Sequence, residues 1–396
     1  MPLMPLMSKI RDVEAVWLHC PLSEAKQHTS DFGRITAFDG VLVTVRTHDG
    51  LVGFGEAKAG VGSAGSGAAL VAIIENELRP ILIGEEAPQI SRLWNRMING
   101  SRAELAERFG RPMPILGRRG IHVAAISGVD LALWDIAGKA RGCSVLELVG
   151  GACRDRVTAY GSGGWGDPAR IGSELKGYLA QGFRAVKMRV GAMDGRIHES
   201  LSRVRAAREA IGRDADLMVD AHGTMNVAQA RRFCEGASEL ELRFVEEPVS
   251  SDDRKGLAEV RATSSIPIAA GESEFTRFDF AELLDRRAID VLQPDLAVTG
   301  GFSEGLKIAA LAESHRLELA PHCWGSAISF SAGLTLAFAS SAGVFMEVPM
   351  GGNPLLREMA SIDLELKDGA LAPPAGPGWG VEPDPDFVMR FAQNRE

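Results

Sequence analysis

The stretch from Leu217 to Ser273 decides the fold of this chain. It contains three short apolar runs that each close on a carboxylate: LMVDAH (217–222), LRFVEEP (242–248) and PIAAGES (267–273). Asp220, Glu246 and Glu272 are separated by 26 residues and then by 26 again. Because a strand, a crossover helix and two loops take up about that length of chain, the spacing predicts three consecutive parallel strands with one carboxylate at the carboxyl end of each.

Three carboxylates at one edge of a sheet predict a cation site. Their mutual repulsion would raise their pKa values and destabilise the fold by on the order of several kcal/mol unless a metal neutralised them. Oxygen-only ligation favours Mg²⁺ over Zn²⁺. A single Asp or Glu after a strand is most often a helix cap or a solvated turn, but the regular spacing favours a metal site.

The same pattern continues toward the carboxyl terminus. Asp295 in VLQPDL, His322 in LAPHCWG and Glu347 in VFMEVP follow at steps of 23, 27 and 25 residues. Strand-helix alternation from Val157 to about Glu347 is typical of a (β/α) barrel. The predicted fold class is therefore α/β, a TIM-type (β/α) barrel with a separate α+β unit.

The capping domain is predicted from the amino-terminal part. Strands VEAVWL, VLVTVRT and LVGFGEA lie within residues 8–60, with a hairpin turn at His48-Asp49-Gly50. Helical spacing follows from Gly67 to about Gly117, and a long helix covers residues 122–142. We expect a capping domain over 1–125, a catalytic barrel over 126–360, and a C-terminal segment over 361–396 that packs back on the capping domain.

Composition excludes several classes of protein. With 396 residues, 45% of them hydrophobic, the chain has room for a barrel of ~250 residues and a second unit. The net charge is −9 and there is no basic stripe, so nucleic acid and anionic membranes are not expected partners. We expect neither a secretion signal nor a membrane span, because residues 1–10 have no basic region before a long apolar run and no stretch approaches ~20 apolar residues. Five scattered cysteines favour a reducing cytoplasm.

Over essentially its whole length the chain resembles the mandelate racemase subgroup of the enolase superfamily. The resemblance rests on RAVKMRVG (184–191), VDAH (219–222), VEEP (245–248), GES (271–273), QPDLAVTGG (293–301) and PHCWG (321–325), in order and at the family's spacing. It implies that the three spaced carboxylates are Mg²⁺ ligands and that Asp295 and His322 form the dyad that moves a proton. It also implies that Lys187 and Glu347 hold the substrate carboxylate. The fold that it implies is a modified (β/α)8 TIM-type barrel with an α+β capping domain whose loops close the barrel mouth.

Elementary chemistry explains why such residues belong together. A proton α to a carboxylate is a very weak acid, and its removal leaves a dianionic intermediate. A divalent cation and the Lys187 ammonium would stabilise the developing negative charge. His322 has a suitable intrinsic pKa for a base, and Asp295 can select its tautomer and stabilise the imidazolium.

Departures from the family pattern discriminate among reactions. A racemase needs a base on each face of the α-carbon, and the family often has Lys-x-Lys where this chain has Lys187-Met188-Arg189. Arginine keeps its proton at neutral pH, so we interpret Arg189 as an electrostatic or substrate-binding group. The muconate-lactonising branch has a lysine where this chain has Asp295. We therefore expect dehydration of a sugar acid, an aldonate or aldarate, to a 2-keto-3-deoxy acid.

The sequence leaves two roles open, that of His222 and that of residues 27–34. His222 follows Asp220 in an Asp-x-His pattern that resembles mannonate dehydratases, so it is either an acid-base residue or a hydrogen-bonded residue that orients Asp220. The segment QHTSDFGR (27–34) is either a cap that binds substrate hydroxyls or solvated surface. Its polar side chains are those of His28, Ser30, Asp31 and Arg34.

Other functions are weighed beside dehydration. A sugar-acid lactone cycloisomerase is the nearest alternative, followed by a racemase or epimerase of a 2-hydroxy acid. A non-catalytic binding protein is least expected, because no ligand or base is missing. The expected partner is a small-molecule carboxylate substrate, and the expected state is a cytoplasmic homo-oligomer.

Overall fold

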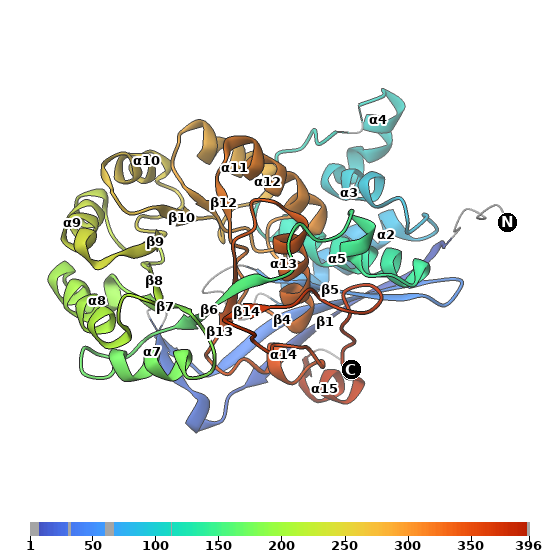
Figure 1. The fold of residues 1–396 in the computed structure, drawn as a ribbon. Helices are drawn as coiled ribbons and strands as arrows, with labels where there is room; N and C mark the ends of the chain where they lie inside the picture. Colours follow the sequence, from blue (N-terminus) through green and yellow to red (C-terminus); the bar gives the residue numbers. More distant parts are fainter. Residues whose placement is uncertain (1–7, 31–32, 60–66, 112, 394–396) are drawn as a thin grey trace.

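The computed structural model describes residues 8–30, 33–59, 67–111 and 113–393, and it contains a barrel beside a smaller sheet-and-helix unit (Figure 1). Eight neighbouring parallel strands form the barrel wall. They are β6 (Val157–Gly163), β7 (Ala185–Arg189), β8 (Asp216–Asp220), β9 (Leu242–Glu246), β10 (Ile268–Ala270), β11 (Val291–Leu292), β12 (Glu318–Leu319) and β13 (Phe345–Pro349). A bridge between Leu319 and Gly343 joins the strand at one end of this order to the segment before β13.

Helices alternate with these strands along the chain. They are α7 (Ile171–Leu179), α8 (Ile197–Ile211), α9 (Val227–Ala237), α10 (Arg254–Thr263), α11 (Thr276–Asp285), α12 (Phe302–His315) and α13 (Ala327–Ala339). The helix that comes directly after β13, α14 (Pro354–Arg357), has four residues, so the last strand-helix unit is modified. The predicted fold class, a modified TIM-type barrel with a capping domain, is confirmed.

Local sequence explains the barrel elements. The strands are buried on both faces, as parallel strands under helices must be, and their residues are predominantly apolar. Inward-facing side chains such as Tyr160, Met218 and Phe244 fill the barrel interior. A capping box between Asn226 and Gln229 begins α9, because each side chain accepts a hydrogen bond from the other residue's backbone N–H.

The capping unit is an antiparallel sheet covered by helices. Its strands are β1 (Ile10–Pro21), β4 (Ala37–Thr47), β5 (Val52–Ala57) and the C-terminal β15 (Ala392–Gln393), in the order β15-β1-β4-β5. The predicted hairpin is present between β4 and β5, with Gly50 at φ 92° in its turn. The helices are α1 (Gly67–Ile73), α2 (Arg79–Leu82), α3 (Ile90–Asn99) and α4 (Ala103–Arg108), with a π-helical turn at Ile74–Leu78.

The QHTSDFGR segment forms a small hairpin that we did not predict. In it β2 (His28–Ser30) pairs antiparallel with β3 (Gly33–Ile35). The two strands, HTS and GRI, contain one apolar side chain between them, that of Ile35, so hydrophobic alternation does not reveal them. Asp31, one of the polar residues expected to line the cap, lies outside the described residues.

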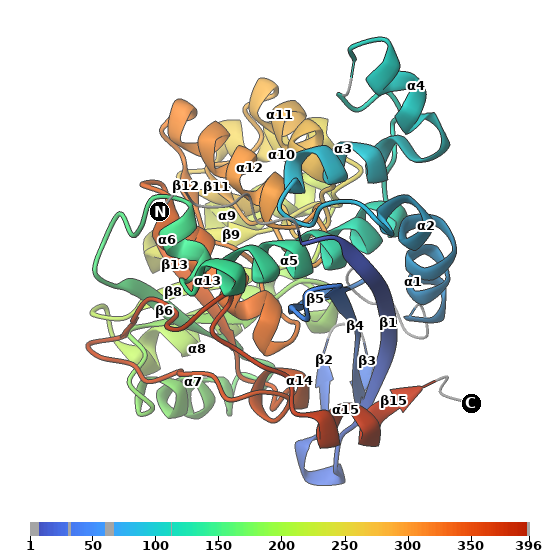
Figure 2. The ribbon, with the colours of Figure 1, turned by 90° about the vertical axis from the view of Figure 1, so that its right-hand side faces the viewer.

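Helix α5 (Ile121–Arg141) runs between the two units and packs on the capping sheet (Figure 2). The contact with β5 is so close that a Cβ on Gly55 would lie 1.9 Å from the carbonyl oxygen of Gly128, so only glycine fits. By length and composition α5 could also cross a membrane, but 83% of its most apolar window is buried inside the protein. It is a core helix, and it spans the expected domain boundary at 125/126.

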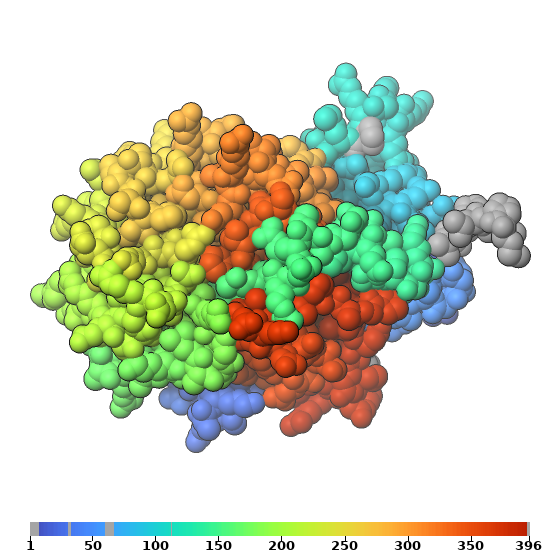
Figure 3. All heavy atoms as spheres, in the orientation of Figure 1, coloured from blue at the N-terminus to red at the C-terminus, as the bar shows by residue number. Residues whose placement is uncertain are grey.

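The C-terminal segment contacts both units. After α14, β14 (Ala370–Leu371) pairs antiparallel with the barrel strand β6. Trp379 then donates a hydrogen bond of 2.9 Å from Nε1 to the carbonyl oxygen of Leu131 in α5. Beyond α15 (Pro385–Phe391), β15 pairs with β1 of the capping sheet. In Figure 3 this red segment covers the surface beside the green α5 and α6 (Val145–Leu148).

Candidate active site

The three spaced carboxylates meet at the carboxyl edge of the barrel. Asp220 and Glu246 are the last residues of β8 and β9 and lie opposite each other in the parallel register. Glu272 follows β10 by two residues. All three are buried. The 26-residue spacing thus corresponds to three adjacent strand ends, because each intervening helix returns the chain to the same edge of the sheet.

The oxygen atoms at this edge fit a divalent cation. Asp220, His222 and Glu272 each place one potential ligand atom within 4.8 Å of the others. Glu246 lies outside that group, with Oε2 held at 2.5 Å by Lys187 Nζ and at 2.8 Å by Gln293 Nε2. Oε1 of Glu246 and Oε1 of Glu272 are buried without a hydrogen-bond partner among the described residues. Buried carboxylate oxygens without partners suit Mg²⁺, which prefers hard oxygen ligands.

Strand β7 supplies two cations to the same edge. The Lys187 ammonium, fully buried, lies 2.9 Å from Glu347 Oε1 and 3.4 Å from Asp220 Oδ2. Burial alone would lower the pKa of Lys187, but the carboxylates of Glu246 and Glu347 raise it well above its ordinary value. Lys187 therefore stays charged at neutral pH.

Arg189 is the second of these cations. It lies opposite Asp220 in the β7–β8 register, and its guanidinium pairs with Asp220 Oδ2. The guanidinium also lies 5.7 Å from the ring centroid of Trp324, within the range of a cation–π contact. The position where the family often has a second lysine therefore holds a fixed positive charge beside an expected metal ligand.

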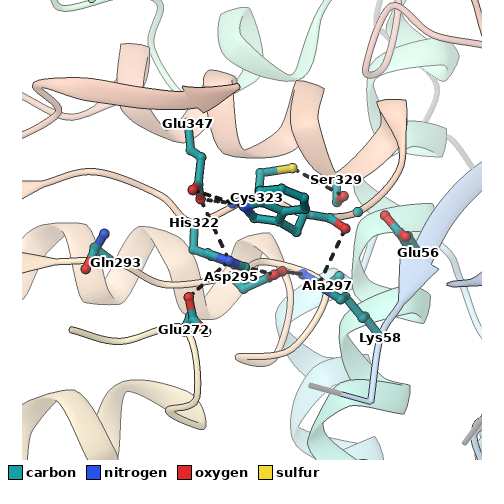
Figure 4. Close-up of polar contacts among 12 residues, drawn as sticks. Glu56, Lys58, Glu272, Gln293, Asp295, Ala297, His322, Cys323, Ser329 and Glu347 are labelled. Atoms are coloured by element: carbon teal, nitrogen blue, oxygen red, sulfur yellow. Dashed lines mark hydrogen bonds and ion pairs between the residues drawn. The ribbon is translucent and has the colours of Figure 1, made fainter. Parts of the chain in front are cut away.

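The expected dyad is assembled from the ends of β11 and β12 (Figure 4). His322 Nδ1 lies 2.9 Å from Asp295 Oδ2, and the two residues form a parallel bridge. The other ring nitrogen, Nε2, lies 3.1 Å from Glu272 Oε2 and 3.7 Å from Glu347 Oε2. Since Nδ1 is engaged by Asp295, Nε2 is the atom that faces the carboxylate cluster.

The charges around the imidazole shift the pKa values of both His322 and Glu272. Burial would lower the pKa of His322, but the nearby carboxylates of Glu272, Glu347 and Asp295 outweigh it and raise the value. Burial opposes ionisation of Glu272, yet the positive charges of His322 and His222, with those of β7, lower its pKa to about 2. A divalent cation on these carboxylates would weaken their pull on the His322 proton.

His222 is brought into the same cluster. Its side chain is 4% exposed, and Nε2 lies 3.3 Å from Asp220 Oδ2. Its backbone has φ 43° in the left-handed region, and its N–H donates to Asp220 Oδ1 at 2.9 Å. This geometry places the imidazole against the expected ligands, where it can orient Asp220, ligate the cation or transfer a proton.

Two residues of this site were not identified from the sequence. Gln293 donates to Glu246, and its signal was its position two residues before Asp295, which puts both side chains on the same side of the chain. Trp324 donates from Nε1 to Glu347 Oε1 at 3.1 Å, and its only signal was its proximity to His322 in PHCWG.

The cap contributes an aromatic contact at the barrel mouth. The ring of His28 in β2 lies 4.3 Å, centroid to centroid, from that of Trp165, which follows β6. Trp165 in turn contacts Trp324 at 5.9 Å. Arg34, by contrast, is exposed and bonds to Gln27 through Nε at 3.1 Å. Of the polar cap residues considered as a substrate-binding cap, His28 thus contacts a barrel residue.

Comparisons with known proteins agree with this arrangement. Residues 15–150 match the mandelate racemase/muconate lactonizing enzyme N-terminal domain, and residues 170–387 match the enolase C-terminal domain-like family. A D-galactarolactone cycloisomerase from Agrobacterium fabrum is 34% identical over 89% of this chain and 90% of its own length. A D-galactonate dehydratase from Verminephrobacter eiseniae is 33% identical over 89% of this chain and 91% of its own.

Solved structures of the same family are also similar to this chain over nearly its whole length. An enolase-superfamily member from Polaromonas sp. JS666 is 31% identical and superposes with a TM-score of 0.85, covering 97% of this chain and 98% of its own. A racemase from Streptomyces coelicolor A3(2) with bound magnesium is 28% identical, with a TM-score of 0.83 and coverage of 97% and 100%. The family expected from the motifs is confirmed: the chain belongs to the enolase superfamily, in its mandelate racemase subgroup.

Proposed function

We propose that this enzyme dehydrates an aldonate or aldarate to a 2-keto-3-deoxy acid, with His322 as the base. The observation that carries the proposal is the Asp295–His322 pair, which leaves Nε2 of the imidazole facing the carboxylate cluster. On strand β7, where a two-base racemase of this family would place a second lysine, the chain has Arg189. One neutral base beside fixed cations favours elimination over racemisation.

The chain's own residues account for the proton transfers. His322 Nε2 accepts the α-proton, and Asp295 stabilises the imidazolium that forms. Lys187 supplies positive charge where the substrate carboxylate becomes more negative. The β-hydroxyl then departs as water after taking a proton, either from His322 in a syn elimination or from His222 in an anti elimination. The resulting enol converts to the 2-keto-3-deoxy acid.

A magnesium ion completes the proposed site. Asp220, Glu246 and Glu272 would hold it, and Oε1 of Glu246 and Oε1 of Glu272 have no hydrogen-bond partner in the described part of the chain that would compete for them. When bound, Mg²⁺ supplies concentrated positive charge that stabilises the negative charge that develops when the substrate loses its α-proton. It would also take over the charge neutralisation that Lys187 and Arg189 give to Asp220 and Glu246 in the structure.

A lactone cycloisomerase is the second candidate. It is favoured by the similarity to the D-galactarolactone cycloisomerase of Agrobacterium fabrum and to a 3,6-anhydro-D-galactonate cycloisomerase from Zobellia galactanivorans, the latter 30% identical with a TM-score of 0.82. Such a reaction needs the same abstraction of an α-proton, but the leaving group is a ring oxygen that stays attached. The two candidates therefore share His322 and differ in the substrate.

Substrate screening in D₂O tests the proposal. Aldonic acids, aldaric acids and their lactones are incubated with the Mg²⁺-loaded enzyme, and the products are identified by NMR and mass spectrometry. Release of water with a 2-keto-3-deoxy acid supports dehydration, and activity on lactones alone supports the cycloisomerase. Inversion at the α-carbon without loss of water would mean that a second base exists and that Arg189 is misread. His322→Asn should abolish α-proton exchange, and exchange at the wild-type rate would refute the assignment of the base.

Two properties of the whole enzyme belong to the same proposal. The five cysteines are free thiols, which supports a reducing, cytoplasmic location. We expect a homo-oligomer in solution, which light scattering coupled to size exclusion would measure.

A further inference from the structure

The end of capping strand β5 reaches both loops that carry the Asp295–His322 pair (Figure 4). The backbone N–H of Lys58, just after β5, donates to the carbonyl oxygen of Ala297 at 3.1 Å. Glu56 Oε2 accepts two hydrogen bonds from Ser326, one from the backbone N–H at 2.8 Å and one from the hydroxyl at 2.7 Å. One short piece of the capping unit thus contacts the loop after each member of the dyad.

Each contact is only a few atoms from the dyad. Ala297 N–H donates to Asp295 Oδ1 at 2.8 Å, so the loop that Lys58 holds is the loop that fixes this carboxylate. Ser326 is the N-cap of α13 and lies four residues after His322. The path from Glu56 to the imidazole therefore passes through the short loop Cys323–Ser326.

The carboxyl group of Glu56 is closely enclosed. The residue is 2% exposed, and burial raises the pKa of its carboxyl group. A Cβ on Gly325 would lie 2.6 Å from Oε2, and one on Gly40 would lie 2.8 Å from Oε1. Hydrogen bonds with the hydroxyls of Ser329 and Ser326 partly offset this rise in pKa. Burying a carboxyl group costs free energy that packing of the two units does not by itself recover, so packing alone does not account for Glu56 at this place.

We propose that Glu56 is a positioning residue for the proton transfer: through Ser326 it holds the loop after β12, and so aims His322 Nε2 at the substrate α-carbon. The inference rests on the proposed role of His322 as the base. The capping unit then does more than cover the barrel mouth, because it completes the support of the catalytic pair. A purely structural Glu56 would affect folding and all ligands alike, whereas a positioning Glu56 affects the chemical step.

Four variants test this proposal. Glu56→Ala removes the acceptor, Glu56→Gln retains an oxygen at almost the same place, and Ser326→Ala removes the hydroxyl donor. Trp134→Phe is the matched control, because it removes a different hydrogen bond between α5 and α12, from Trp134 Nε1 to Ser303 Oγ at 2.9 Å. For each variant kcat, KM, the Mg²⁺ affinity from calorimetry, and α-proton exchange in D₂O are measured, with circular dichroism to establish folding.

Glu56→Ala should lower kcat and the exchange rate together by ~10²-fold, the cost typical of a misplaced catalytic group. KM and the Mg²⁺ affinity should stay within about twofold, since the ligands and Lys187 do not contact Glu56. Glu56→Gln should restore most of kcat. In Ser326→Ala kcat should fall about fivefold, as expected for the loss of one hydrogen bond. If Glu56→Ala does not fold, Ser326→Ala tests the proposal in its place. Trp134→Phe should match the wild type in kcat.

The proposal is overturned if Glu56→Ala folds and keeps wild-type kcat, or if its kcat, KM and Mg²⁺ affinity all worsen in parallel. If Glu56→Ala does not fold, wild-type kcat in Ser326→Ala overturns it. A different result is expected if the proposed role of His322 as the base is itself wrong. If His322 is not the base, His322→Asn retains exchange whatever the Glu56 variants do. If His322 is the base but Glu56 does not position it, His322→Asn loses exchange while Glu56→Ala keeps it.

Discussion

His322 Nδ1 lies 2.9 Å from Asp295 Oδ2, and this contact determines which ring nitrogen faces the carboxylate cluster. A neutral imidazole carries one N–H, and hydrogen bonding to the carboxylate places it on Nδ1. The lone pair is then on Nε2, which faces Glu272 and Glu347.

The acid limb of the pH profile should move when Asp295 is changed. His322 accepts a proton only when it is neutral, so kcat/KM falls as the pH drops through its pKa. Nearby carboxylates raise that pKa, and Asp295→Asn removes one of them, so the limb should move to lower pH. At the optimum kcat should fall by ~10²- to 10⁴-fold, because the correct tautomer is no longer favoured. Steady-state kinetics at saturating Mg²⁺ measure the position of the acid limb and kcat at the optimum, with Glu282→Gln as the control. An acid limb that moves to higher pH in Asp295→Asn would contradict the assignment of His322 as the base.

Chelation should abolish turnover and lower the stability of the protein. Magnesium at 100 times its Kd adds about 2.7 kcal/mol to the free energy of unfolding. Glu272→Ala should lose both the activity and this Mg²⁺-dependent gain. Urea unfolding with EDTA or with Mg²⁺ measures the gain, and Glu282→Gln should retain it. Full activity after exhaustive chelation would rule out the metal site.

Lys187→Met should abolish turnover and destabilise the metal-free protein. The substitution keeps the length of the side chain but removes the ammonium that contacts Asp220, Glu246 and Glu347. Leaving buried carboxylates without their counter-charge costs about 3–5 kcal/mol. Urea unfolding in EDTA should show this loss, and Mg²⁺ should recover part of it. Unchanged stability in EDTA would mean that these carboxylates do not depend on Lys187.

His222→Asn should separate the two interpretations of this residue. If His222 protonates the leaving hydroxyl, the variant keeps α-proton exchange in D₂O but loses release of the keto acid. If it orients Asp220, the Mg²⁺ affinity falls by about 10- to 100-fold and both rates fall with it. We expect the first result, because the Nε2 of His222 faces the cluster where the substrate must lie. Calorimetry and the exchange assay together distinguish the two.

Arg189→Lys restores the Lys-x-Lys pattern and tests whether Arg189 blocks racemisation. A lysine can lose its proton in a low-dielectric site, whereas a guanidinium does not. The variant should show slow exchange or inversion at the α-carbon without loss of water, detected by chiral chromatography. Arg189→Met should weaken turnover without producing the inverted acid. Inversion by the wild type would contradict the prediction.

The sequence by itself determined the barrel and its order of charged groups. Each interval of about 25 residues must contain a strand, a helix and two turns, so Asp220, Glu246 and Glu272 had to fall at adjacent strand ends. The hairpin at His48-Asp49-Gly50 was also predictable, because its signals are local. Chain length and local turn chemistry are enough for such features.

Only the tertiary structure decided which side chains touch. Glu56 reaches Ser326 across 270 residues of sequence, and His28 reaches Trp165 from a hairpin whose polar strands carry no hydrophobic pattern. The Arg189 guanidinium meets Asp220 because β7 and β8 are in a particular register. Contacts of this kind depend on how elements distant in the sequence pack together and on side-chain rotamers. Spacing along one chain constrains neither, so the support of the catalytic pair by the capping strand appears only in three dimensions.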